Sequence, residues 1–125
     1  MTESQLDFQL LFEESPEVLL VLLPDAPRFT MVAATRNRLL ATQTTREDTI
    51  GKGLFELFPD NPDDVSADGT ANLRASLNRV LATRSADTMP VQKYDIRDAN
   101  GNFIAKYWSP KNIPVLSSKR FPIGI

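Results

Sequence analysis

The stretch Tyr94-Asp-Ile-Arg-Asp-Ala-Asn-Gly-Asn-Phe-Ile-Ala-Lys-Tyr-Trp108 decides the fold class, because it holds two extended segments joined by a turn. The run Asp98-Ala-Asn-Gly-Asn102 in its middle carries an Asn-Gly pair, a strong signal for a tight hairpin. The flanking residues 89–96 and 103–115 therefore predict two antiparallel strands. Prolines interrupt the second of these segments twice, which places it at a sheet edge or at bulges.

The segment before this hairpin predicts the clearest helix of the chain, over residues 70–83. Its apolar residues fall at positions i, i+4, i+7 and i+8 and form one stripe (Leu73, Leu77, Val80, Leu81). Such a stripe is typical of a helix that packs on a sheet or another helix.

Two further strands are expected near the N-terminus. Residues 18–23 form an apolar run between two prolines, too short for a useful helix and consistent with a strand buried on both faces. Residues 29–34 follow after a short proline-containing turn, which favours an antiparallel hairpin. Thr35 is a good cap for a short helix that carries Leu39 and Leu40.

Shorter helical elements fill the middle of the chain. The run Thr44-Thr-Arg-Glu47 matches a capping box, and Gly51 would end that turn. Residues 53–58 predict another helical turn, and residues 59–69 a polar loop. The acidic residues of this loop lack the spacing of a calcium-binding loop, so we expect no metal site.

The order of these elements predicts an α+β fold. We expect a mostly five-stranded antiparallel sheet, with short helices and one longer helix packed on one face. A helix over residues 1–15 would precede a domain formed by residues 16–125.

Composition excludes several classes of function. The 125 residues contain no cysteine and no histidine, which removes Ser-His-Asp and Cys-His nucleophiles, the usual zinc sites, haem held by His or Cys, and a flavin adduct to cysteine. We therefore expect no cofactor of these kinds. The 14 basic and 16 acidic residues also argue against a nucleic-acid partner.

Charge is distributed unevenly along the chain. Residues 1–27 hold six acidic residues and no basic one, which indicates a solvated helix or an interaction element. The longest apolar run has six residues, far short of a membrane span, and the N-terminus has no basic region of a signal peptide. We therefore expect a cytoplasmic protein without a membrane partner.

Three segments resemble a PAS domain. Phe8-Gln-Leu-Leu-Phe-Glu-Glu-Ser-Pro16 resembles the helix-to-strand entry of PAS sensors, and Thr45-Arg-Glu-Asp-Thr-Ile-Gly51 with Leu54-Phe-Glu-Leu-Phe-Pro59 resembles the family's "REELIG…LFDLFP" signature. The hairpin from Tyr94 to Val115 resembles the strands that follow the main PAS helix. Thr35 departs from the family, which often has Asn there.

The resemblance implies a sensory and protein-interaction module of a bacterial-type signalling protein, such as a sensor histidine kinase. The output would come from a downstream domain of the same chain, and the N-terminal helix would pair in a homodimer. The final PAS strand normally runs past Gly124-Ile125, so we expect the chain to stop within that strand as a piece of a longer protein.

A PAS-like fold leaves space between sheet and helices that can hold a small ligand. Five candidate contacts for an unidentified small ligand are Met31, Phe55, Leu77, Tyr94 and Trp108, although core packing without a ligand also accounts for them. Gln92, Tyr94 and Ile96 share one strand face, and Ile104, Lys106 and Trp108 share another, because side chains alternate. The pattern leaves open which face points inward.

The candidate dimer contacts are Leu6, Leu10 and Phe12, which offer more apolar surface than one short helix easily hides. A small cone-shaped α+β enzyme, of the isomerase or dehydratase type, is the alternative to a sensor. Such chemistry needs a buried carboxylate close to a phenol, and Asp95 is a poor candidate because it adjoins Tyr94 on a strand. We therefore expect no catalytic residues.

Overall fold

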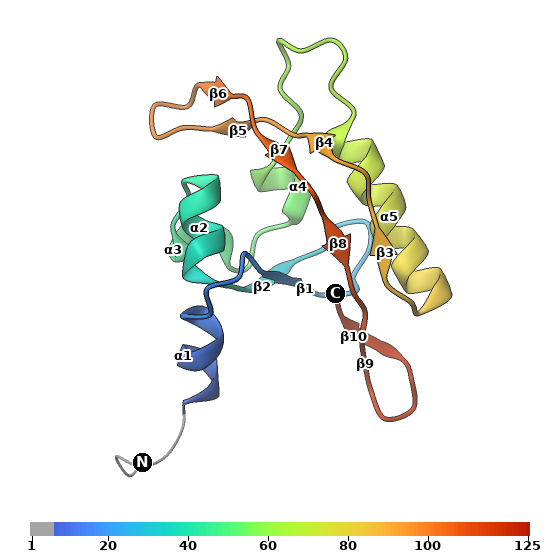
Figure 1. Ribbon diagram of the computed structural model, residues 1–125. Helices are drawn as coiled ribbons and strands as arrows, with labels where there is room; N and C mark the ends of the chain where they lie inside the picture. Colours follow the sequence, from blue (N-terminus) through green and yellow to red (C-terminus); the bar gives the residue numbers. More distant parts are fainter. Residues whose placement is uncertain (1–6) are drawn as a thin grey trace.

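The computed structural model describes residues 7–125, which form five helices and ten short strands (Figure 1). The helices are α1 (Phe8–Glu13), α2 (Arg36–Thr42), α3 (Arg46–Thr49), α4 (Leu54–Leu57) and α5 (Gly69–Thr83). The strands are β1 (Leu20–Leu22), β2 (Met31–Ala34), β3 (Asp87–Thr88), β4 (Gln92–Lys93), β5 (Ile96–Arg97), β6 (Phe103–Ile104), β7 (Tyr107–Trp108), β8 (Lys111–Asn112), β9 (Val115–Leu116) and β10 (Pro122–Gly124).

The short strands join into five extended segments. The first two are β1 and β2, the third contains β3 to β5, the fourth contains β6 to β9, and the fifth runs from β10 to Ile125. The third and fourth segments pair antiparallel through β3–β8, β4–β7 and β5–β6. The fourth and fifth pair through β9–β10, and the first two through β1–β2.

Backbone hydrogen bonds between Leu22 and Ile125, of 2.9 and 3.0 Å, join the first segment to the fifth. The five segments therefore lie in the order second, first, fifth, fourth, third. Helices α2, α4 and α5 cover one face of this antiparallel arrangement, and α5 lies along the third and fourth segments (Figure 1). The predicted α+β class is confirmed.

The two long strands predicted over residues 89–96 and 103–115 are corrected to chains of two-residue strands. Prolines lack the N–H that a continuous ladder requires, and Pro90, Pro110 and Pro114 lie in gaps between strands, although the gap at residues 94–95 and 105–106 contains no proline. Single hydrogen bonds bridge the gaps, from the Met89 amide to the Pro110 carbonyl (3.0 Å) and from the Tyr94 amide to the Lys106 carbonyl (2.8 Å).

The predicted Asn-Gly hairpin is confirmed between β5 and β6. The Asp98 carboxylate accepts hydrogen bonds from the amides of Asn100 and Asn102, at 2.9 and 3.0 Å. Gly101 has a φ of 80°, which glycine adopts without steric cost. Local side-chain chemistry is therefore sufficient to place this turn.

Side-chain caps set the starts of the short helices. Thr35 caps α2 as predicted, since its hydroxyl accepts a hydrogen bond from the Arg38 amide at 3.3 Å. The capping box predicted at Thr44 is wrong by one residue, because Thr45 accepts from the Asp48 amide at 3.1 Å and caps α3. Thr44 instead bonds the Thr42 hydroxyl at 2.8 Å.

The core lies between α5, α4 and the first two strands. The stripe predicted on α5 faces it, with Leu77 and Val80 fully buried and Leu73 and Leu81 packed against the same cluster. At the N-terminal end of α5, the Asp60 carboxylate accepts hydrogen bonds from the backbone amide and the hydroxyl of Thr70 (3.1 and 2.6 Å). The polar loop thereby fixes where the helix begins.

Candidate functional site

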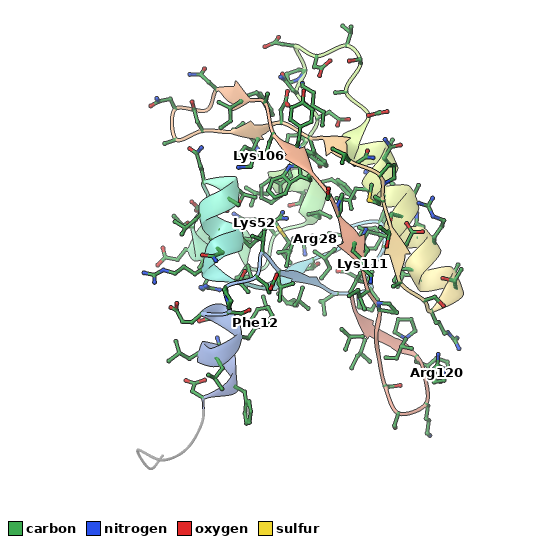
Figure 2. All side chains as sticks on the ribbon, in the orientation of Figure 1. Phe12, Arg28, Lys52, Lys106, Lys111 and Arg120 are labelled. Atoms are coloured by element: carbon green, nitrogen blue, oxygen red, sulfur yellow. The ribbon has the colours of Figure 1, made fainter. Side chains whose placement is uncertain are left out.

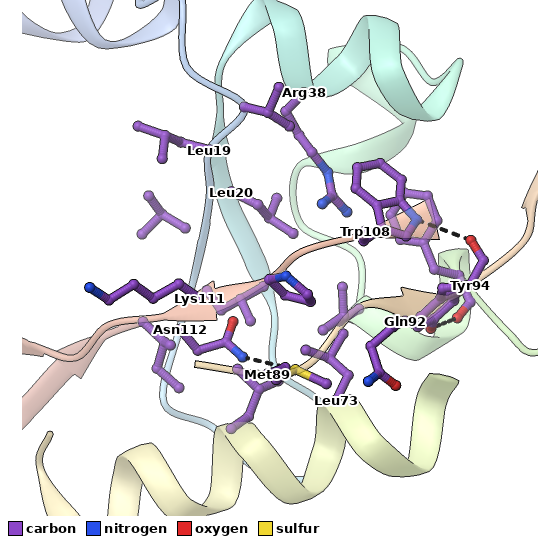
Figure 3. A pocket seen from close by; sticks show the side chains of 18 of the residues that line it. Leu19, Leu20, Arg38, Leu73, Met89, Gln92, Tyr94, Trp108, Lys111 and Asn112 are labelled. Carbon is purple, nitrogen blue, oxygen red and sulfur yellow. Dashed lines mark hydrogen bonds between the residues drawn. The ribbon is translucent and has the colours of Figure 1, made fainter. Parts of the chain in front are cut away.

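A cavity of about 510 Å³ lies between the sheet and its covering helices. This volume falls within the usual range for small-molecule sites. The wall contains side chains of α2 (Arg38, Thr42), α4 (Leu54), α5 (Leu73, Leu77) and the sheet (Leu20, Gln92, Tyr94, Ile96, Trp108). Most of these groups are apolar, and Figure 3 shows those from α2, α5 and the sheet converging on one space.

The structure decides which strand face points inward. Gln92, Tyr94 and Ile96 all line the cavity, and Gln92 and Ile96 are buried. Trp108 lines it from the neighbouring segment, opposite Gln92 in the β4–β7 pair.

The polar atoms of both aromatic residues bond the backbone rather than the cavity. The Tyr94 hydroxyl donates a hydrogen bond to the Phe58 carbonyl. Burial raises the pKa of Tyr94 above its usual range, so this phenol remains protonated. The Trp108 indole N–H donates to the Tyr94 carbonyl at 3.0 Å (Figure 3). Both residues therefore present only their apolar bodies to a ligand.

The amides of the wall are also paired. Gln92 accepts a hydrogen bond from the Asn72 amide through Oε1 (2.9 Å) and donates from Nε2 to the Pro90 carbonyl (2.9 Å). Asn112 donates to the Ser76 hydroxyl at 2.8 Å, and Ser76 in turn donates to Asp87 at 2.6 Å.

Arg38 is the charged side chain of α2 that reaches the cavity. Its guanidinium carbon lies 5.3 Å from the centre of the Phe58 ring and 5.4 Å from the Trp108 ring. Both distances are within the range of cation–π attraction. Removal from water lowers the pKa of Arg38 to about 10. The guanidinium therefore stays protonated at neutral pH.

Arg38 was absent from the residues predicted from sequence. Two arginines close together on a seven-residue helix, Arg36 and Arg38, ordinarily predict a solvated face. The available signal was its spacing, since Arg38 and Thr42 lie four residues apart on one face, next to the buried Leu39. Its closeness to Phe58 and Trp108, which only the folded chain shows, places that face at the cavity.

The structure brings three of the five predicted ligand residues together. Leu77, Tyr94 and Trp108 line the cavity. Met31 and Phe55 are not among its lining: Met31 is fully buried in the core, and Phe55 packs edge-on against Phe29 with ring centres 6.4 Å apart. Phe55 also lies 4.3 Å from the Arg74 guanidinium, which covers its other side.

The predicted dimer residues have different surroundings. Leu6 lies outside the described residues, and Leu10 is 53% exposed on α1. Phe12 is half-buried and lines the cavity from the end of α1 nearest the sheet (Figure 2). One helix therefore carries both a solvent-facing apolar residue and a cavity contact.

The carboxylate–phenol pair that the isomerase alternative needs is not assembled in the cavity. Asp95 does not line it, and its carboxylate accepts hydrogen bonds from Lys93 (2.9 Å) and Asn61 (3.1 Å). Burial raises the pKa of Asp95, but these hydrogen bonds outweigh it and the net shift is downward. The group is therefore a charged partner of Lys93, not a proton-accepting base beside Tyr94.

Within residues 7–125, no three carboxylates come together in a way that could hold a metal ion. None of the helices in this part of the chain has the length and apolarity needed to cross a bilayer.

Comparison with known proteins gives fold neighbours but no sequence relatives. No protein-family model matches the chain, and no curated protein matches it in sequence. Among solved structures, a Rhodobacter sphaeroides LOV protein aligns with a TM-score of 0.64 and 18% identity, over 93% of this chain and 59% of that one. The chain thus spans less than two thirds of that protein.

Two further neighbours are covered over most of their length. The PAS domain of the fruit-fly ELK potassium channel aligns with a TM-score of 0.61 and 13% identity, over 94% of this chain and 87% of that one. A sensory box sensor histidine kinase from Vibrio cholerae aligns with a TM-score of 0.58 and 16% identity, over 94% of this chain and 82% of that one. The order of the five segments, the covering helices and these alignments together establish that the chain has the PAS fold, as its sequence motifs predict.

Proposed function

We propose that this domain is a sensory module that binds a small molecule in its cavity and passes the binding event to a downstream output domain. The observation that carries the proposal is the cavity of about 510 Å³, walled by apolar side chains and placed between sheet and helices. A histidine kinase or a similar catalytic domain is the expected output, because one fold neighbour is a sensor histidine kinase. We place the protein in the cytoplasm.

Helix α1 is the element that would transmit the effect of ligand binding from the cavity to the rest of the protein. Phe12 contacts the cavity directly. Ion pairs between Glu13 and Arg46 (3.3 Å) and between Glu14 and Arg36 (3.5 Å) hold the end of α1 to α3 and α2. A ligand that displaces Phe12 would therefore change how α1 sits on the domain. Such coupling requires the ligand to bind the two arrangements of α1 with different affinity.

The partner of α1 is proposed to be α1 of a second copy. Phe8, Leu10 and Leu11 expose 75%, 53% and 54% of their surface, which is more apolar area than a six-residue helix normally leaves in water. Pairing in a homodimer would cover these side chains and leave Asp7 and Glu14 in solvent.

Ligand binding is tested by ligand-observed NMR with a library of small molecules, comparing the wild-type domain with Leu73→Trp. Leu73 lines the cavity, so a tryptophan there fills the space and should abolish saturable binding. Ala75→Trp, at an exposed position of the same helix, is the matched control and should bind as the wild type does. Absence of any saturable binder sensitive to Leu73→Trp contradicts the sensory proposal.

Pairing is tested by sedimentation of Leu10→Asp and Leu40→Asp. Both leucines are exposed, Leu10 on α1 at 53% and Leu40 on α2 at 68%. We expect the wild type to sediment as a dimer, Leu10→Asp as a monomer, and Leu40→Asp as a dimer. A wild type that stays monomeric at high concentration, or equal effects of the two substitutions, would remove α1 as the dimer contact.

A further inference from the structure

Arg38 is a cation at the cavity wall without a counterion. No ion pair or side-chain hydrogen bond within residues 7–125 uses its guanidinium, and the charged partners on the neighbouring elements pair with other groups. The Phe58 and Trp108 rings, at 5.3 and 5.4 Å, are its near neighbours. A cation kept partly out of water between two rings has five N–H donors to satisfy.

Five of the other polar side chains of the wall already use their donor groups in internal hydrogen bonds. Tyr94, Trp108, Gln92 and Asn112 all donate to protein acceptors, as described above. The Thr42 hydroxyl bonds the Arg38 carbonyl at 3.0 Å. The exposed Lys111 amine points away from Arg38 in Figure 3. Within residues 7–125, the Ser109 hydroxyl and the Lys111 amine of the wall also make no side-chain hydrogen bond, but both residues are exposed, whereas Arg38 is half-buried. Arg38 is therefore the half-buried group of the wall whose hydrogen bonds remain available.

We propose that the cavity recognises an amphipathic monocarboxylate, with Arg38 pairing the carboxylate and the apolar wall holding the rest of the molecule. This inference rests on the proposed sensory function and names its class of ligand. A guanidinium presents two parallel N–H groups that match a carboxylate in a bidentate pair. Leu20 and Leu73, both half-buried, supply apolar surface for a hydrocarbon body.

The number of charges favours one carboxylate over a polyphosphate or tricarboxylate. A ligand with several negative charges would need several cations close together, whereas the other cation of the wall within residues 7–125, Lys111, is exposed and points away from Arg38 (Figure 3). A neutral apolar ligand would leave the guanidinium without a partner. The lowered pKa of about 10 still keeps Arg38 protonated at neutral pH, so the charge needed for pairing is present.

The test compares acids with alcohols of the same shape. The probes are octanoate with 1-octanol, and cyclohexanecarboxylate with cyclohexylmethanol, titrated at pH 7 into the wild-type domain. The chain has one tryptophan, Trp108, whose ring lies 5.4 Å from the Arg38 guanidinium, so its fluorescence reports binding directly. At least one acid should bind at least about ten-fold more tightly than its alcohol, as expected for a charge-assisted hydrogen-bonded pair.

Arginine variants assign the preference to one residue. Arg38→Met should abolish the difference between acid and alcohol while the alcohol affinity is kept, and Arg38→Lys should keep part of it. Arg84→Met is the matched control, because Arg84 also lies over an aromatic ring, Phe121 at 5.2 Å, but outside the cavity. It should leave the preference unchanged.

Each outcome decides the proposal. Equal binding of acid and alcohol to the wild type overturns the role of Arg38 and leaves the sensory proposal intact, and this comparison requires no variant to fold. A preference that survives Arg38→Met, or is lost in Arg84→Met, also overturns it. If no probe binds, the monocarboxylate class is wrong, and the Leu73→Trp library experiment decides the sensory function separately.

Discussion

Replacing Gly69 with alanine should destabilise the domain, although alanine is the better helix former. Gly69 is the first residue of α5, and it is buried against the Tyr94 ring. A Cβ at this position would lie 2.7 Å from Cδ2 and 2.9 Å from Cγ of Tyr94. Contacts this short require the ring to move. The ring is held at both ends, because its hydroxyl donates to Phe58 and its backbone carbonyl accepts from Trp108.

The two opposing effects can be compared in magnitude. Alanine gains about 0.5–1 kcal/mol over glycine inside a helix, and this is an upper bound for Gly69 because it is the first residue of α5. Overpacking of a closely packed site costs about 1–3 kcal/mol. The expected result for Gly69→Ala is therefore a net loss on the order of 1–2 kcal/mol in the free energy of unfolding.

The assay is urea unfolding followed by far-UV circular dichroism and by the fluorescence of Trp108. Ala75→Gly, at an exposed position of α5, measures the helix-propensity contribution in the same helix. A double-mutant cycle with Tyr94→Ala then isolates the contact, because residues that touch show a coupling of about 0.5–3 kcal/mol. In the Tyr94→Ala background, Gly69→Ala should be neutral or stabilising.

Two results would refute this reasoning. Gly69→Ala could stabilise the wild-type domain by as much as Ala75→Gly destabilises it, which would mean that only propensity acts. Alternatively, its effect could be the same with and without the Tyr94 ring. Either result would show that Tyr94 does not pack against the start of α5, and the described wall of the cavity would be wrong at that point.

Three further predictions follow from burial, charge and composition. Leu77→Ala should cost about 2–5 kcal/mol because Leu77 is 0% exposed, whereas Asn78→Ala, at an exposed position of the same helix, should not lower the urea midpoint; equal losses would contradict the assigned face of α5. Hydrogen bonds from Lys93 and Ser66 lower the pKa of Asp64 to about 2 from 3.8, so its stabilising contribution is present above pH 3.8 and is lost as the pH falls toward 2. Between pH 3.8 and 2, the free energy of unfolding should fall less steeply in Asp64→Asn than in the wild type. An equal fall in both proteins would argue against the Lys93 contact. The purified domain should show no Soret band because it has neither Cys nor His to hold haem iron, and illumination should produce no cysteinyl flavin adduct; a Soret band would reveal an unusual set of haem ligands.

Local patterns in the sequence were sufficient for much of the fold. The stripe on α5, the Asn-Gly turn and the Thr35 cap depend on residues within a few positions of each other, and the structure agrees with all three. The Thr44 capping box failed because two adjacent threonines satisfy the same pattern, and the pairing of Thr42 with Thr44 leaves Thr45 to cap α3.

The proline positions predicted that the sheet is interrupted, but not how many short strands result. Pro110 and Pro114 indicated an irregular fourth segment. The division of both long segments into two-residue strands depends on which carbonyl meets which amide across the sheet, and that register involves partners about twenty residues apart in the chain.

The candidate site depended most on tertiary structure. Sequence alternation grouped Gln92, Tyr94 and Ile96 on one face, but only the position of α5 shows that this face is inside. Met31 and Phe55 match the chemistry of a ligand contact as well as Leu77 does, and packing alone removes them from the cavity wall.

Arg38 shows most clearly what the sequence alone could not predict. Composition and periodicity established an α+β domain without cysteine or histidine chemistry, because those properties belong to single residues and their near neighbours. Whether an arginine on a short helix meets water or a cavity depends on side chains 20 and 70 positions away, Phe58 and Trp108. Burial and the loss of a counterion are properties of the folded chain as a whole, so only the tertiary structure could assign them.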